Sequence, residues 1–330
     1  MYREFNTRRP ALSALLLLVA LSWWSCGVSA PAQDATDDLA DPLGVLALKT
    51  DNRLVYGRFL SNGIQQVEEQ SSEDFSGLTV EAIRQSLRQR TSRSTALPKT
   101  ALPELRTAED RYQHMIRSTL LLGTIYDCGR CDNLHANVAG GVVVSSDGLA
   151  LTNYHVLDRS DDGIKAMTAM TYDGQSYPIV EVLASDRGAD VALIRLGGPG
   201  PFYAAPLARQ QPFPTEPVRV MSHPSNEYFV MTTGEVSRVA NFSARRSRSH
   251  WMEITAPFGA GSSGSGVFND QGEVVGLVSR IHPIFRDSNT RQPLPDDESE
   301  SKATRYVEMI LRRCVTLDGI MDCFQQEDDS

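Results

Sequence analysis

Three residues whose types could carry out acyl transfer stand in order along the chain. His155 lies in the motif LTNYHVL, Asp190 directly precedes the apolar run VALIRL, and Ser263 lies in the motif GSSGS. A neutral serine hydroxyl is a weak nucleophile, so acyl transfer requires an adjacent imidazole to accept its proton and a buried carboxylate to hold that imidazole in one tautomer. The three residues are therefore a candidate base, orienting carboxylate and nucleophile.

The serine belongs to a glycine-rich segment, residues 256–269. This segment reads APFGAGSSGSGVFN and contains four glycines and three serines between two apolar runs. Glycine lets backbone amides converge where side chains would otherwise collide, as an oxyanion hole beside a nucleophile requires. Composition alone favours a flexible loop. The upstream histidine and aspartate are what indicate a catalytic turn.

Two other assignments of these residue types are weaker. Ser263, Asp270 and His282 follow the chain order of an α/β-hydrolase, but the serine two positions after the nucleophile breaks the elbow pattern Gly-x-Ser-x-Gly, and no helical pattern follows. Asp186 competes with Asp190 as the orienting carboxylate. Only Asp190 directly precedes an apolar strand, so it is the preferred residue.

From about residue 108 the chain consists of short apolar and β-branched runs separated by turn residues, a pattern typical of hairpins. The runs predict two blocks of six strands, at residues 118–126, 140–145, 149–152, 166–172, 177–183 and 191–196, and at residues 218–221, 229–232, 234–239, 250–254, 266–268 and 274–278. A helix from residue 303 to about 315 is expected near the C-terminus. The predicted fold class is all-β, with two six-stranded antiparallel β-barrels, a C-terminal helix and a partly helical N-terminal extension.

These motifs resemble those of trypsin-like serine proteases with the chymotrypsin fold, and most closely the bacterial HtrA/DegP-type protease domain. The order His, Asp, Ser is that of the family, and the spacings of 35 and 73 residues between the three agree with it. The resemblance covers roughly residues 111–282. It implies a chymotrypsin-like fold, His155 as general base and acid, and the backbone amides of Gly261 and Ser263 as the oxyanion hole. No domain resembling a PDZ module is expected after His282.

The same resemblance implies a specificity pocket for the residue before the scissile bond. Its walls would be Ala256, Pro257, Phe258, Val278, Ser279 and Arg280. No acidic residue stands at the head of the nucleophile motif, where cleavage after Lys or Arg would need one. We therefore expect hydrolysis of polypeptide substrates after small or medium apolar residues, with no cofactor and no catalytic metal. The alternative is a non-catalytic protein-binding module on a protease-like fold, for which a broken triad would be typical.

The N-terminus has the pattern of a secretory signal peptide. Three arginines precede an apolar run at residues 11–24, and small residues follow. The run is short for a membrane span, so no stable membrane insertion is expected once residues 1–32 are removed. A lipoprotein anchored through Cys26 is disfavoured, because two tryptophans and a serine precede this cysteine. We expect an exported protein, periplasmic or secreted.

The charge argues against nucleic acid as a partner. The chain of 330 residues has a net charge of −9, with 32 basic and 41 acidic residues. Removing residues 1–32 removes three arginines and one glutamate, which leaves 29 basic and 40 acidic residues and a net charge of −11. With neither a basic domain nor a base-stacking motif, no nucleic-acid binding is expected.

Residues 33–106 form a polar segment before the β pattern. Apolar residues at helical spacing predict a helix at residues 79–90, and a linker follows at residues 92–107. We interpret 33–106 as an accessory segment or propeptide. The expected protease domain is 107–330, with a first barrel at about 111–198, a second barrel at about 212–282, and a C-terminal loop and helix at 283–330.

Four cysteines remain after the signal peptide: Cys128, Cys131, Cys314 and Cys323. An even number in an exported protein favours disulfides, and all three connectivities stay open. His135 completes the pattern Cys-x-x-Cys-x-x-x-His, which could be part of a zinc site. The oxidising environment of an exported protein favours a disulfide over a zinc site here.

Overall fold

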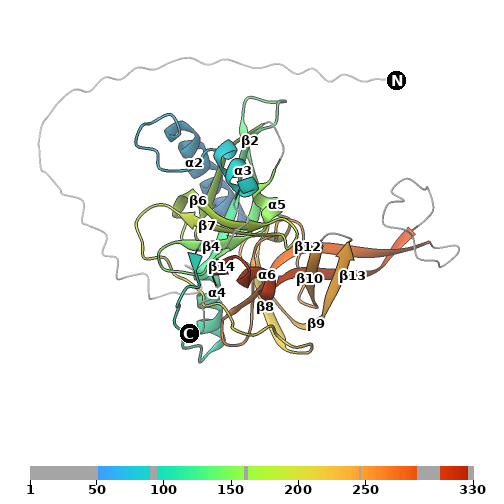
Figure 1. Ribbon diagram of the computed structural model, residues 1–330. Coiled ribbons are helices and arrows are strands. Elements are labelled where there is room, and N and C mark those ends of the chain that lie inside the picture. Colours follow the sequence, from blue (N-terminus) through green and yellow to red (C-terminus); the bar gives the residue numbers. More distant parts are fainter. Residues whose placement is uncertain (1–50, 90–94, 160–162, 245–246, 288–304, 326–330) are drawn as a thin grey trace, which may run out of the picture. The chain divides into compact units, whose positions relative to one another are not determined.

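The computed structural model describes residues 51–89, 95–159, 163–244, 247–287 and 305–325 (Figure 1). The predicted signal peptide, with Cys26, lies outside the described residues, as does most of the loop predicted at 283–302. The two barrels that position the candidate site lie within them.

Six antiparallel strands close the first barrel, in the order β2-β3-β4-β7-β6-β5. They are β2 (Thr119–Asp127), β3 (Leu134–Val143), β4 (Leu149–Thr152), β5 (Ile164–Met170), β6 (Ser176–Asp186) and β7 (Val191–Leu196), and each overlaps one predicted strand of the first block. In β2, Leu120 and Leu122 join one buried cluster whereas Leu121 and Ile125 join another. Successive side chains of a strand point to opposite faces. Both faces of β2 are therefore covered, which explains its continuous apolar run.

A second closed barrel has the order β10-β13-β12-β11-β8-β9. Its strands are β8 (Pro217–Ser222), β9 (Val230–Ala244), β10 (Ser247–Ile254), β11 (Gly266–Phe268), β12 (Val274–Asp287) and β13 (Arg305–Thr316). Strand β9 unites two runs that the sequence predicted as separate strands. Gly234, where the second predicted run begins, lies where a Cβ atom would collide with the backbone of Ala256. This glycine therefore permits close packing and marks no turn.

The helix predicted from residue 303 to about 315 is wrong, because β13 forms there. This strand pairs with β12 along its length and with β10 at residues 312–315. Without it, β10 and β12 would each present an unpaired edge, and closing the barrel satisfies both. The C-terminal helix is instead α6 (Leu317–Met321), whose first turn is capped by the Thr316 hydroxyl. The predicted fold class is confirmed.

The N-terminal segment packs on the first barrel through α2 (Asn52–Glu69), which the sequence did not predict. The Phe59 ring is fully buried, and a Cβ atom added at Gly123 of β2 would lie 3.2 Å from it. A Cβ atom at Gly63 would collide with Ile125. The helix and the strand therefore approach each other closely at two points along α2.

Two further elements tie this segment to the rest of the chain. Helix α3 (Val80–Gln89) confirms the predicted helix and buries Ile83 and Leu87 in a cluster with residues of β2. The predicted linker contains β1 (Thr95–Ala96), which pairs in parallel with β14 (Phe324–Gln325) near the C-terminus. Helix α4 (Ala108–Ser118), capped by Thr107 and Asp110, then leads into β2.

Candidate active site

His155 lies on the single-turn helix α5 (Tyr154–Leu157), directly after β4, and its imidazole faces Asp190. Its Nδ1 atom lies 3.0 and 2.9 Å from the two carboxylate oxygens, and its backbone amide donates to Oδ1 at 3.1 Å. The Asp190 side chain is 5% exposed and the His155 side chain 47%. Because the carboxylate accepts, Nδ1 carries the proton and Nε2 is left with a lone pair.

Asp190 is held in place by Ser279 and Asn153 in addition to His155. The Ser279 hydroxyl donates to Oδ2 at 2.5 Å, and the Asn153 side-chain amide donates to the Asp190 carbonyl at 2.9 Å. Burial raises the pKa of Asp190, but the hydrogen bonds from His155 and Ser279 outweigh it and leave the pKa below its ordinary value. The residue has a φ of 61°, a conformation that aspartate tolerates better than most residues. The site therefore holds an ionised carboxylate against the imidazole.

Ser263 is linked to this pair through Ser279. The Ser263 hydroxyl donates to the backbone carbonyl of Ser279 at 3.1 Å, while the Ser279 hydroxyl binds Asp190. The Ser263 carbonyl in turn accepts from the Gly140 amide at 2.7 Å. One residue of the second barrel thus contacts both the serine and the carboxylate, and the three predicted residues lie in one site.

The junction between the barrels is closed by glycine packing. Gly264 has a φ of +83°, and a Cβ atom there would collide with the Gly140 carbonyl and the Thr152 hydroxyl. The Thr152 hydroxyl itself donates to the Gly140 carbonyl at 2.9 Å. Because Thr152 ends the strand before α5, this contact brings the segment that bears His155 against the turn that bears Ser263.

The predicted oxyanion amides belong to a tight turn. Gly261 has a φ of +92°, and a Cβ atom there would lie 2.5 Å from the His223 carbonyl. Ser262 is buried and its hydroxyl donates to that of Ser222 at 3.1 Å. Within the part of the chain that the structure describes, the amides of Gly261 and Ser263 have no hydrogen-bond acceptor. Such amides are available to an oxyanion.

His223 links the two barrels next to the turn that contains Gly261, a role that sequence reasoning missed. Its Nε2 donates to the Leu120 carbonyl of β2 at 3.0 Å, and its Nδ1 accepts from the Phe229 amide at 3.2 Å. The side chain is fully buried, and burial lowers its pKa to about 4. The imidazole is therefore neutral at pH 7 and supports the backbone that crowds Gly261.

The residues of the predicted specificity pocket have different surroundings. Ala256, Phe258 and Val278 are buried in the core of the second barrel. Pro257 and Arg280 are exposed, and the Arg280 guanidinium lies over the Trp251 ring at 4.6 Å. The sixth residue, Ser279, contacts Asp190 and Ser263, a role that sequence reasoning also missed. Its only signal was its place directly after an apolar strand.

The rejected aspartates have structural contacts of their own. The Asp186 carboxylate accepts from the amides of Gly188 and Ala189 at 2.6 and 3.0 Å, and so shapes the turn before Asp190. Asp270 pairs with Arg219 on β8. Neither contact involves His155 or Ser263.

In the part of the chain that the structure describes, Cys128, Cys131 and Cys314 are free thiols. Cys314 is buried in the second-barrel core, where burial raises its thiol pKa, and Cys323 is buried in a different cluster. Cys128 and Cys131 lie in the loop between β2 and β3 with their sulfur atoms 3.4 Å apart. The predicted disulfides stay predictions.

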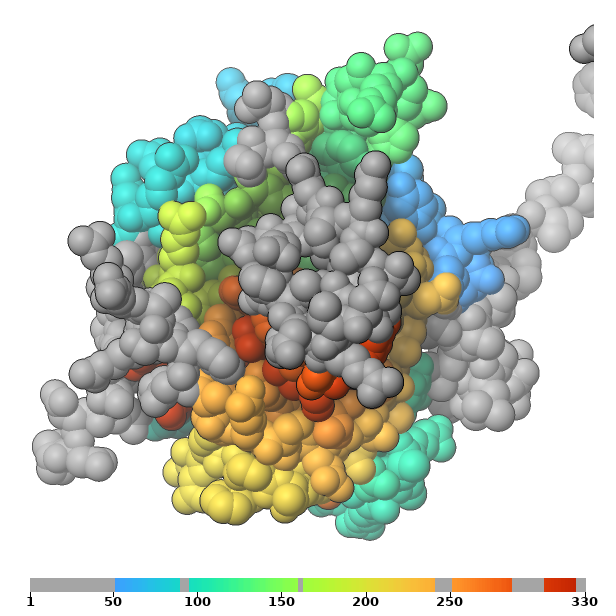
Figure 2. Space-filling view, turned by 90° about the vertical axis from the view of Figure 1, so that its right-hand side faces the viewer, coloured from blue at the N-terminus to red at the C-terminus, as the bar shows by residue number. Residues whose placement is uncertain are grey.

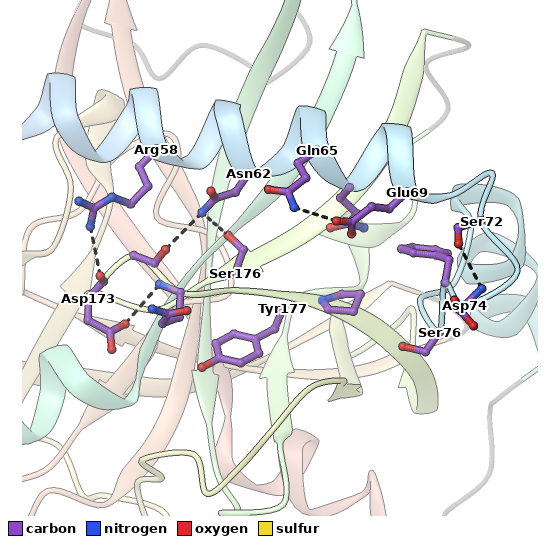
Figure 3. A pocket seen from close by; sticks show the side chains of 15 residues that line it. Arg58, Asn62, Gln65, Glu69, Ser72, Asp74, Ser76, Asp173, Ser176 and Tyr177 are labelled. Atoms are coloured by element: carbon purple, nitrogen blue, oxygen red, sulfur yellow. Dashed lines mark hydrogen bonds between the residues drawn. The ribbon is translucent and has the colours of Figure 1, made fainter. Parts of the chain in front are cut away.

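A cavity of about 920 Å³ lies between α2 and the β5–β6 turn, and no candidate catalytic residue lines it (Figure 3). Polar contacts cross it: Arg58 donates to the Asp173 carbonyl at 3.1 Å, and Asn62 donates to the Ser176 hydroxyl at 2.8 Å. These bonds attach the N-terminal helix to the barrel. We interpret the cavity as a polar interface between α2 and the first barrel.

The comparisons with known proteins agree with this fold. Residues 139–277 match the model of the trypsin-like peptidase domain family. Serine endoprotease DegS of Escherichia coli K12 is 23% identical over 195 residues, which cover 57% of this chain and 54% of the relative. Serine protease HTRA1 of Xenopus laevis is 33% identical over 143 residues, 42% of this chain and 30% of the relative. A probable periplasmic DegP-like endoprotease of Pseudomonas fluorescens is 26% identical over 147 residues, 44% and 30% of the two chains.

The chain thus spans about half, or less, of the length of these curated relatives. Among the described residues, every helix is too short or too polar to cross a membrane.

Proposed function

Because residues 139–277 carry a trypsin-like peptidase domain, we propose that the protein is an exported serine endopeptidase with Ser263 as nucleophile, His155 as base and Asp190 as orienting carboxylate. The observation that supports this most directly is the pair of bonds made by Ser279, one to Asp190 and one to Ser263. They connect the three side chains across the junction of the barrels.

Acylation begins with a rotation of the Ser263 side chain. In the structure its hydroxyl donates to the Ser279 carbonyl, so it must turn to the Nε2 lone pair of His155. Rotamer changes of this kind take picoseconds to nanoseconds at exposed positions. The oxygen then attacks the substrate carbonyl while His155 accepts the proton, and Asp190 stabilises the imidazolium. The Ser279 carbonyl is left free to accept a substrate N–H.

The amides of Gly261 and Ser263 stabilise the negative charge on the substrate oxygen by donating hydrogen bonds to it. Two preoriented donors need no reorganisation when the charge develops, which is why such sites contribute strongly to the rate. His155 next donates its proton to the leaving amine, and water, activated by the same imidazole, hydrolyses the acyl-enzyme.

For substrates we propose polypeptides cleaved after small or medium apolar residues. Among the six predicted pocket residues, Arg280 is the only charged one, and its guanidinium lies over Trp251. A cationic side chain would find no carboxylate among them. Peptide-library profiling that returned dominant cleavage after Lys or Arg would overturn this part of the proposal.

The test of activity is labelling with a fluorophosphonate, which reacts with activated serines. We expect labelling of the wild-type protein, its loss in Ser263→Ala, and retention in Ser265→Ala as the matched control. Peptide hydrolysis should fall in parallel. An unlabelled wild-type protein, or a labelled Ser263→Ala variant, would support a non-catalytic binding module instead.

Export and processing are tested separately, by sequencing the N-terminus of the mature protein. We propose that the signal peptide is removed and that residues 51–106 stay as an accessory part, because α2 and α3 bury Phe59, Ile83 and Leu87 against the first barrel. A mature terminus near residue 107 would identify a propeptide.

A further inference from the structure

The tip of the β2–β3 hairpin, which comprises the connecting loop and the start of β3, gathers three side chains that bind soft metal ions. The sulfur atoms of Cys128 and Cys131 lie 3.4 Å apart, and His135 Nε2 lies 3.1 Å from the Cys131 sulfur. All three ligand atoms are within 4.8 Å of one another. The loop projects from the first barrel (Figure 2), so the cluster is open to solvent. It lies outside the candidate active site, and no step of the proposed reaction uses it.

The backbone of this loop is folded around the first sulfur. Gly129 has a φ of +64°, which glycine adopts without strain, and its amide donates to the Asp127 carboxylate at 2.7 Å. The turn directs the backbone amides of Arg130 and Cys131 at the Cys128 sulfur. Such donors stabilise a thiolate, which is the form that ligates metal.

The histidine is positioned by the sheet. His135 lies on β3 directly opposite Tyr126 of β2, and the two rings are 5.6 Å apart. Because the strand pairing fixes this register, the imidazole is held beside the loop while the cysteines are carried by the turn. Two independent elements thus present ligands to one point.

We propose that Cys128, Cys131 and His135 bind one Zn²⁺ ion, with water in the fourth position. Zn–S bonds of about 2.3 Å and Zn–N bonds of about 2.0 Å at tetrahedral angles place neighbouring ligand atoms roughly 3.5–3.8 Å apart. The separations in the structure are 3.4 and 3.1 Å, so small side-chain shifts suffice. The ion would fasten the tip of the hairpin. A Cys128–Cys131 disulfide is the competing state, and in it His135 has no ligand role.

The experiment uses the full chain carrying Ser263→Ala, reduced and freed of metal, so that its outcome does not depend on protease activity. Titration with Co²⁺ as a spectroscopic probe should give about one equivalent of tetrahedral, thiolate-ligated ion, and Zn²⁺ should displace it. Cys128→Ser and Cys131→Ser should each abolish this signal, and His135→Ala should weaken binding at least about tenfold. His282→Ala is the histidine control and should bind normally.

Alkylation mapping provides a readout that needs no variant. Zn²⁺ should protect Cys128 and Cys131 from iodoacetamide in the folded protein, whereas the buried Cys314 and Cys323 should be protected with or without metal. The proposal is overturned if the reduced protein binds no Co²⁺. It is equally overturned if Cys128→Ser and His135→Ala bind Co²⁺ as tightly as the parent chain does.

Discussion

The two barrels have the same number of strands but are stabilised and used differently. The first is covered by α2 and α3 and supplies His155 and Asp190, which side-chain hydrogen bonds hold in place. The second has a long β12–β13 hairpin that extends from the barrel (Figure 1). Apolar side chains of this hairpin, such as Met309, are exposed. It supplies the Ser263 turn, in which backbone crowding against glycines sets the geometry. One half of the site thus depends on polar contacts and the other on the absence of Cβ atoms.

The largest expected effect tests the helical cover of the first barrel. Phe59→Ala should lower the free energy of unfolding by about 3–5 kcal/mol, because it removes a fully buried ring and leaves a cavity over Gly123. Leu54→Ala, at a position 56% exposed on the same helix, is the matched control and should change it by less than about 0.5 kcal/mol. Denaturant unfolding measures both. Equal, small effects would mean that α2 is dispensable to the barrel.

The next effect tests the backbone crowding in the second barrel. Gly261→Ala should lower kcat/KM by about 10²–10³, since a methyl group 2.5 Å from the His223 carbonyl displaces the amide that we propose for the oxyanion hole. The control is Gly57→Ala, because an added Cβ atom on this exposed turn of α2 meets nothing within 4 Å. That change should leave activity intact and stabilise the helix by about 0.5–1 kcal/mol. Full activity in Gly261→Ala would remove glycine crowding from the explanation.

A third prediction concerns the junction of the barrels and its dependence on pH. The folded pKa of His223 is about 4, below the unfolded value of about 6.5, so the unfolded chain takes up the proton first as the pH falls. The stabilising contribution is complete above pH 6.5 and should decline by roughly 3 kcal/mol between pH 6.5 and 4. His114, whose pKa burial also lowers, adds in the same direction. Unfolding curves at pH 7 and pH 4.5 measure the loss, and a pH-independent stability would contradict it.

The smallest effect is expected on the exposed hairpin of the second barrel. Met309, 55% exposed on β13, should accept lysine with a change in unfolding free energy within about 0.5 kcal/mol. The same substitution at Val315, 1% exposed on the same strand, should be severely destabilising because it buries a charge. A large effect at Met309 would show that this face of the hairpin is covered in solution.

The barrels were predictable because their strands are short apolar runs between turn residues. Helix α2 was not, because its buried face is Val55, Phe59, Gly63 and Gln66, and a stripe that includes glycine and glutamine gives a weak helical period. Strand β13 was mistaken for a helix because its pairing with β10 and β12 is long-range, and tertiary pairing overrides local pattern.

The candidate site likewise contains residues that the sequence predicted and residues that it did not. Residue type, order and spacing predicted His155, Asp190 and Ser263 as the candidate triad, since few residue types can perform this chemistry. The positions of Ser279 and His223 depend on which strands meet across the two barrels. A serine after an apolar strand and a histidine before a proline carry no mark of those roles in the sequence.

The pairing of β1 with β14 has a consequence for how the chain could be processed. Residues 97–107 connect the N-terminal helices to α4, yet those helices are also held by buried side chains and by a strand next to the C-terminus. A single cut in this connector would therefore not release the N-terminal part. The product would be a nicked, two-chain protein that migrates as two bands on a denaturing gel and elutes as one species from a sizing column.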